Sequence, residues 1–393
     1  MNHLALSALL AVAQEPVPPT TPVELELFAA GGPARGESVR LLGWESGNPR
    51  LGVRGEARAE ASWLALDFRA TPTAVPEGSW RLALGGGGLL RGRPEATAEG
   101  QAGFALAGLQ GKAAVLPLDT LWVQRLGRDR LPLAEEDRDV LWARISEGGR
   151  DVQRGYFLEW TMDGVDFEGP GGVRSFPWEE LDGFGLLEEA LPVPAEAVWV
   201  QLRQGSSLTA TVSAVRGGRL ELELPWGAGW SVGLEDVARI ERLAGLVDLA
   251  DDRWAVVEEP ASEAMDWSPK VDRAVEGGFL RVGGIHYPTG LGVRAPTVLQ
   301  RTVSRPGILF LGVGVDDQVL AFHRPQALHF EVLLDGELLA GVGRQARGER
   351  VQNLVLELAQ PGQLTLRVRG ADGLPFGAHA DWLGLRFLPR PAQ

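Results

Sequence analysis

The segment PFGAHADWLGLRF, residues 375–387, contains three residues that often take part in chemistry: His379, Asp381 and Trp382. Catalysis is not indicated, because no nucleophile lies nearby in a motif context. As a ligand site, Trp382 would offer a stacking face and Asp381 a hydroxyl acceptor. As structure, Trp382 would begin the last strand and close one end of a β-sandwich, while Asp381 would hold the preceding loop. The sequence leaves both interpretations open.

The direction of Trp382 depends on the regularity of this last strand. Successive side chains of a strand point to opposite faces, so Leu383, Leu385 and Phe387 would share one face. Trp382 would then point to the other face unless a β-bulge intervenes.

A second candidate is His286-Tyr287, which precedes Pro288 and a turn at Thr289-Gly290. An imidazole and an aromatic ring at the edge of a loop would hydrogen-bond to a sugar and stack on it. In the alternative, Tyr287 packs beneath the turn.

Two acidic residues, Asp316 and Asp317, follow the apolar run from Ile308 to Val315. Carboxylates at the exit of a strand are ligands that calcium prefers, so a structural calcium ion is one interpretation. The alternative is that they accept hydrogen bonds from backbone N–H groups of the next loop. No other cofactor is expected.

The composition excludes several classes of function. With 38 basic and 52 acidic residues, the net charge is −14, which disfavours nucleic acid and anionic membranes as partners. The chain has no cysteine, which removes disulfides, thiol nucleophiles and Cys-based metal sites. No acidic pair stands out as the acid/base couple of a glycosidase. We therefore expect a protein that is not an enzyme.

The N-terminus predicts export. An apolar stretch from Leu4 to Val12 ends in Ala11-Val12-Ala13, a small-x-small cleavage pattern, so residues 1–13 are interpreted as a signal peptide. Residues 14–22 form a Pro-rich linker. No stretch reaches the roughly 18 apolar residues that span a bilayer. The expected location is periplasmic or secreted.

The first part of the chain contains a fourfold repeat. Its segments are residues 23–70, 78–127, 138–187 and 196–244. Each begins with an alternating strand and a Gly- or Ser-rich turn, and ends on a polar residue followed by apolar ones. Short strands between Gly, Asp and Pro turns predict all-β units of the SH3 or Sm barrel type.

A different β domain is expected over residues 246–390. An acidic linker leads into strand-like runs such as ILFLGVGV and ALHFEVLL, and Asp335-Gly336 marks a hairpin turn. Several antiparallel strands of this kind predict a β-sandwich of the jelly-roll type.

The order GGIHYPTGLGVRAPTVL, FLGVGVDD, FEVLLDGELL and HADW resembles the NPCBM family, the novel putative carbohydrate-binding module, over about residues 246–388. The resemblance implies a galactose-binding-like β-sandwich that binds glycan. The sequence departs from the family pattern where Arg294, Ala295, Thr297 and Arg301 replace its usual polar residues, and Ala378 stands where the family often has Asp. These departures affect ligand recognition more than the fold.

Together these observations predict an exported, non-enzymatic bacterial protein whose C-terminal module binds glycan or a cell-surface partner. Two alternatives remain. One is a structural or assembly protein that uses both regions for protein–protein contacts, and the other is a non-catalytic accessory to a glycoside hydrolase.

Overall fold

The computed structural model describes residues 24–30, 37–53, 56–60, 62–68, 79–84, 88–96, 102–106, 113–115, 120–125, 137–145, 149–161, 163–187, 192–225, 229–260, 266–317, 327–371 and 379–390. The expected signal peptide, the Pro-rich linker and Ala378 lie outside these residues. The described part contains strands and two short 3-10 helices, η1 (Trp178–Glu180) and η2 (Leu234–Asp236). None of its helices is long and apolar enough to cross a membrane. The all-β prediction is confirmed.

Four successive groups of five strands make up the first region. The first group is β1 (Glu24–Ala29), β2 (Glu37–Glu45), β3 (Asn48–Val53), β4 (Glu56–Ala59) and β5 (Trp63–Asp67). The second is β6 (Trp80–Leu84), β7 (Gly88–Ala96), β8 (Ala102–Leu106), β9 (Ala113–Val115) and β10 (Thr120–Arg125). The third is β11 (Asp139–Arg144), β12 (Arg150–Trp160), β13 (Gly164–Gly169), β14 (Gly172–Pro177) and β15 (Leu181–Gly185). The fourth is β16 (Val198–Leu202), β17 (Ser207–Arg216), β18 (Arg219–Glu223), β19 (Gly229–Gly233) and β20 (Val237–Arg242).

All four groups have the same strand pairing. The first four strands pair in sequence order, and the fifth returns to pair with the first, always antiparallel. Each group lies inside one of the four sequence segments. The segment boundaries and the SH3 or Sm type stay predictions.

The groups join through their fifth strands. β5 pairs with β20, and β10 pairs with β15. At the centre of these pairings Leu66 faces Ile240 and Val123 faces Phe184, and all four side chains are buried. Because these four residues hold equivalent positions in their groups, each pairing is close to twofold symmetric.

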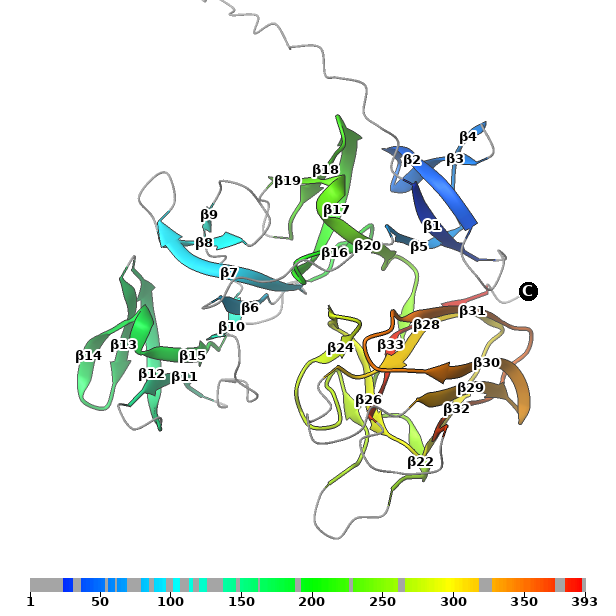
Figure 1. Cartoon of the computed structure of the whole chain (residues 1–393). Helices are drawn as coiled ribbons and strands as arrows, with labels where there is room; N and C mark the ends of the chain where they lie inside the picture. The colour runs from blue at the N-terminus through cyan, green and yellow to red at the C-terminus, as the bar shows by residue number, and fades with distance from the viewer. Residues whose placement is uncertain are drawn as a thin grey trace, which may run out of the picture.

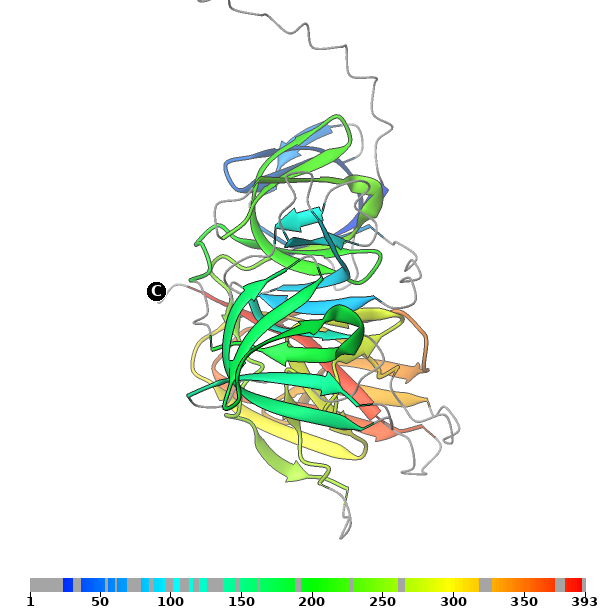
Figure 2. The same cartoon turned by 90° about the vertical axis from the view of Figure 1, so that its left-hand side faces the viewer.

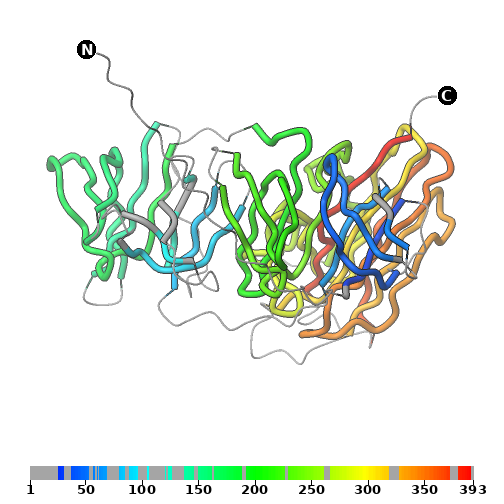
Figure 3. Tube along the Cα trace, turned by 90° about the horizontal axis from the view of Figure 1, so that it is seen from above, coloured from blue at the N-terminus to red at the C-terminus, as the bar shows by residue number. Residues whose placement is uncertain are grey.

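A shorter pairing of β7 with β17 connects the two pairs of groups. The groups therefore follow one another in space as third, second, fourth and first (Figure 1), and the view from above in Figure 3 shows the same row. Groups that are distant in sequence are thus neighbours in the fold.

The C-terminal region is a sandwich of two sheets. One sheet contains β21 (Val247–Asp248), β23 (Lys270–Val271), β26 (Gly290–Arg294), β28 (Gly307–Val315), β31 (Gln352–Leu358) and β33 (His379–Pro389). The other contains β22 (Ala255–Glu258), β27 (Thr297–Val303), β29 (Leu328–Leu334), β30 (Glu337–Gln345) and β32 (Gly362–Gly370). A hairpin of β24 (Leu280–Val282) and β25 (Ile285–Tyr287) lies beside them. The sandwich prediction is confirmed.

Every residue of β28 is buried, because both faces of this strand are covered. Leu309, Leu311 and Val313 point into the sandwich core. Ile308 and Phe310 point outward and pack against the first five-strand group. At Gly314 a Cβ atom would come within 2.3 Å of Val282 on the β24–β25 hairpin, so this close approach requires glycine.

The outer face of the six-stranded sheet and the adjacent hairpin therefore dock on the first region. Phe28 packs on Phe310, and Trp199 packs on Tyr287. Phe279 reaches the second group, where the Arg81 guanidinium lies 4.3 Å from the centre of its ring. Figure 2 views this arrangement from the end of the row formed by the third group.

Candidate functional site

The pairing of β26 with β33 brings two predicted regions together at one end of the sandwich. Arg294 is directly opposite His379, and Gly292 is opposite Asp381. Both His379 and Asp381 are buried, at 2% and 0% exposure. The last residues of β26 and the first of β33 therefore define this end.

Four side chains from separate segments meet here, and we call them the end cluster: Trp267, Glu276, Arg294 and His379. The Arg294 Cζ atom lies 4.0 Å from the centre of the Trp267 ring. The rings of Trp267 and His379 are 5.6 Å apart, and His379 Nδ1 is 3.7 Å from Glu276 Oε1.

The end cluster has the chemistry of a site for hydroxyl groups. Trp267 is 9% exposed, and its ring packs against Arg294, which is only partly buried. Burial lowers the pKa of Arg294, while the charge of Glu276 opposes this effect. A guanidinium offers several donors in one plane and a carboxylate accepts, so the two together match a pair of sugar hydroxyls.

Trp382 lies in the sandwich core and not at the surface. Its side chain is fully buried and meets Phe330 edge to face at 5.3 Å. A bulge in β33 sets this direction: Gly384 has a φ of +51°, and the pairing with β28 shifts register next to it. As a result Leu385 shares the core with Trp382, whereas Leu383 packs outside it. In this structure the indole presents no face to a ligand.

Asp381 is enclosed beside two other acids. Its Oδ2 accepts a hydrogen bond from the Arg281 backbone N–H at 3.2 Å, and its Oδ1 accepts none from the described residues. Burial raises the pKa of Asp381 well above its usual range, and the charges of Asp316 and Asp317 add to this. Asp381 thus connects β33 to the β24–β25 hairpin.

Asp317 also connects to the β24–β25 hairpin. Its Oδ2 accepts the Gly284 N–H at 2.6 Å and lies 3.5 Å from Arg281 Nε. Asp316 is 1% exposed. In the described part of the chain, no group of three or more His, Cys, Asp or Glu residues is placed to hold a metal ion. The predicted calcium site gains no support from this geometry.

His286 and Tyr287 face the first region. Gln201 Nε2 donates a hydrogen bond to the His286 carbonyl at 2.7 Å. Burial lowers the pKa of His286 well below its usual value, and the charges of Arg91, Arg81 and Arg281 lower it further. Tyr287 lines a cleft of about 400 Å³ between the two regions, together with Arg239 and Asn353.

Sequence reasoning thus selected His379 but missed three of its neighbours: Trp267, Glu276 and Arg294. Trp267 lies in the acidic segment that precedes the sandwich strands, and Arg294 was considered only as a departure from the family pattern. Their separation in sequence concealed the cluster, because only the pairing of β26 with β33 and the path of the linker bring them together.

The two antiparallel sheets form the β-sandwich that the resemblance to the NPCBM family implied. Residues 251–388 match the family model of the NPCBM/NEW2 domain, so this part of the chain is an NPCBM/NEW2 domain. The resemblance found in the sequence is confirmed for this part. No curated protein matches the sequence.

Three solved structures illustrate the similarity. The second CBM51 and INT domains of Clostridium perfringens ZmpB, solved with GlcNAc, share 21% identity over 48% of this chain and 40% of that chain, with a TM-score of 0.34. The CBM51 of a C. perfringens GH95 protein, solved with methyl-galactose, shares 16% identity over 34% of this chain and 99% of that chain, with a TM-score of 0.29. The tandem CBM51 modules of a Streptococcus pneumoniae family 98 glycoside hydrolase share 11% identity over 76% and 88%, with a TM-score of 0.33. The chain therefore spans less than half of the first of these structures.

Proposed function

We propose that this chain is an exported, non-enzymatic protein that binds glycan through the end cluster of its NPCBM/NEW2 domain. The main support is the family match over residues 251–388. The meeting of Arg294, Trp267 and Glu276 at one end of the sandwich supports the location of the site. Calcium is not part of the proposal, because Asp317 already accepts a backbone hydrogen bond and faces Arg281.

The first region has a supporting role in this proposal. It covers the outer face of the six-stranded sheet and the β24–β25 hairpin through Phe28 and Trp199. A domain held in this way presents its glycan site in one orientation.

The test is binding of the full chain to a glycan array, followed by calorimetry with the glycans that bind. Arg294→Gln keeps most of the side-chain length but removes the guanidinium, so we expect affinity to fall at least about tenfold, the cost of losing a charged hydrogen bond. Arg347→Gln, at an exposed arginine in the turn after β30, is the matched control and should bind as the wild type does. Absence of binding to every glycan would contradict the proposal.

A second candidate is a structural or assembly protein in which both regions make protein contacts. The observation that favours it is the apolar interface between them, built from two clusters around Phe310 and Tyr287. This candidate expects no glycan binding by the wild type. The array therefore separates the two functions.

A further inference from the structure

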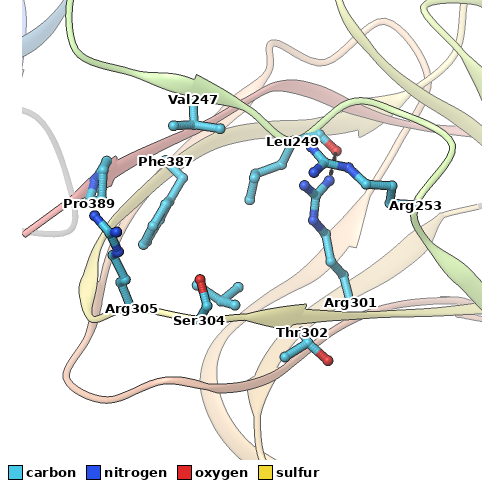
Figure 4. A pocket seen from close by; sticks show the side chains of 10 residues that line it. Val247, Leu249, Arg253, Arg301, Thr302, Ser304, Arg305, Phe387 and Pro389 are labelled. Carbon is cyan, nitrogen blue, oxygen red and sulfur yellow. Dashed lines mark hydrogen bonds between the residues drawn. The ribbon is translucent and has the colours of Figure 1, made fainter.

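A groove on the sandwich is lined by three arginines and no carboxylate. It lies between the segment 247–253, which crosses the edge of the sandwich, and the end of β27 (Figure 4). Its volume is about 330 Å³, in the range of small-molecule sites. The arginines are Arg253, Arg301 and Arg305.

The positive charge of the groove is only partly compensated. Asp251 stands behind it, 2.7 Å from the Arg301 guanidinium and 2.8 Å from Arg253 Nε. Although burial acts in the other direction, hydrogen bonds from Arg253 and Arg301 lower the pKa of Asp251 and keep it ionised. One carboxylate therefore faces two arginines.

Arg305 is the third charge, and it is available. Its side chain is exposed and makes no hydrogen bond or ion pair with any residue that the structure describes. Arg253 and Arg301 share Asp251, and the charge of Asp252 also acts on Arg253, so the excess positive charge of the groove is that of Arg305. This excess occurs in a chain whose net charge is −14, so it is a local feature and not a reflection of composition.

Between the arginines the groove is apolar. Leu249 and Phe387 project into it (Figure 4), and Val303 is a further apolar residue of its lining. Thr302 and Ser304 add hydroxyl groups from β27 and the residue after it. A ligand that fits this surface carries an anionic group, an apolar face and hydroxyls.

We propose that the groove binds a uronic-acid unit of an acidic saccharide. Arg305 receives the carboxylate, since its planar guanidinium matches a carboxylate with two parallel hydrogen bonds. The apolar face of the sugar ring lies against Leu249 and Phe387. The inference extends the proposed glycan-binding function to a second, acidic subsite, and it involves none of the end-cluster residues.

The experiment titrates glucuronate, glucose and acetate separately into the full chain, followed by NMR or calorimetry. Glucuronate and glucose differ only in the carboxylate at one carbon, and acetate carries the carboxylate without the sugar. We expect saturable binding of glucuronate that is at least about tenfold tighter than that of either control and weakens with added salt. Arg305→Gln should reduce it by about tenfold without changing the melting temperature, because Arg305 has no partner in the described fold.

The variants and the control ligands distinguish the ways in which the proposal could fail. Equal binding of glucose and glucuronate would contradict recognition of the carboxylate by the arginines. Binding of acetate as tight as that of glucuronate would contradict recognition of the sugar. Loss of glucuronate binding in Arg294→Gln but not in Arg305→Gln would show that the end cluster binds glucuronate, and it would contradict the proposed site in the groove. If neutral glycans fail to bind but glucuronate still requires Arg305, the end-cluster proposal is wrong and the groove stands.

Discussion

Phe28 in β1 and Phe310 in β28 pack with their ring centroids 6.0 Å apart, although 282 positions separate them in the sequence (310 − 28). Both rings are almost fully buried, at 3% and 1% exposure. Their contact joins the first five-strand group to the outer face of the sandwich. If the two regions separated, each would expose apolar surface to water, which costs free energy.

Phe310→Ala tests this contact. Removing a buried phenylalanine leaves a cavity between the regions, so we expect the free energy of unfolding to fall by about 3–5 kcal/mol in denaturant titration. Tyr156→Ala is the control, because Tyr156 is 55% exposed and should change stability by less than about 0.5 kcal/mol. An equal loss in both variants would contradict a buried interface.

Arg239 and Glu241 form a buried ion pair beside this interface, 2.6 Å apart and 5% and 6% exposed. Arg239→Met should destabilise the fold by about 3–5 kcal/mol, because it leaves Glu241 buried without its partner. In the double variant Arg239→Met/Glu241→Met, replacing both charges should recover most of this loss. A double-mutant cycle measured by chemical denaturation checks the coupling, and strictly additive losses would show that the pair is not coupled.

Trp382→Ala addresses the residue that sequence alone left between ligand stacking and structure. Since the indole is fully buried against Phe330, we expect a loss of about 3–5 kcal/mol in unfolding free energy. Trp382→Phe, which keeps an aromatic ring in the core, should cost less. A variant that loses glycan binding with an unchanged melting temperature would instead assign Trp382 to the site.

Asp272 predicts a pH effect. Burial of its carboxylate raises the pKa to about 6, and the charge of Asp248 adds to this, although a hydrogen bond from the Gly290 N–H acts in the opposite direction. The folded state therefore binds the proton more tightly than the unfolded chain. The stability from this group is fully present below about pH 4 and is lost as the pH rises through 6.

The measurement compares the wild type with Asp272→Asn from pH 4 to pH 7. Asn keeps an acceptor for Gly290 and tolerates the positive φ of this position, 55°. The melting temperature of the variant relative to the wild type should rise across this range, by a small amount because the residue as a whole is exposed and solvent screens its charge. A difference that does not depend on pH would contradict the raised pKa.

Local patterns were sufficient to predict the strands. Alternating apolar residues and Gly-rich turns indicated the all-β class, and the fully apolar run from Ile308 to Val315 matches a strand that is covered on both faces. The same order of strand and turn patterns recurs along the first region, and this recurrence indicated the four segments. In the C-terminal region, the ordered motifs were specific enough to identify the NPCBM/NEW2 domain.

The site was less accessible to sequence reasoning. His379 was selected, but its neighbours Trp267, Glu276 and Arg294 come from different segments. A single glycine, Gly384, reversed the face of Leu383 relative to Leu385, and no period-2 pattern shows such a bulge in advance. Side-chain direction in β33 therefore required the structure.

By itself the sequence determined the elements, because strand formation depends on neighbouring residues and their alternation. Only the tertiary structure decided which elements lie together: that the groups are arranged as third, second, fourth and first, and that His286 and Tyr287 face the first region. Such contacts depend on the shape and chemistry of surfaces that form after the strands have paired. The segment PFGAHADWLGLRF thus identified a domain, while the pairing of Arg294 with His379 located its candidate site.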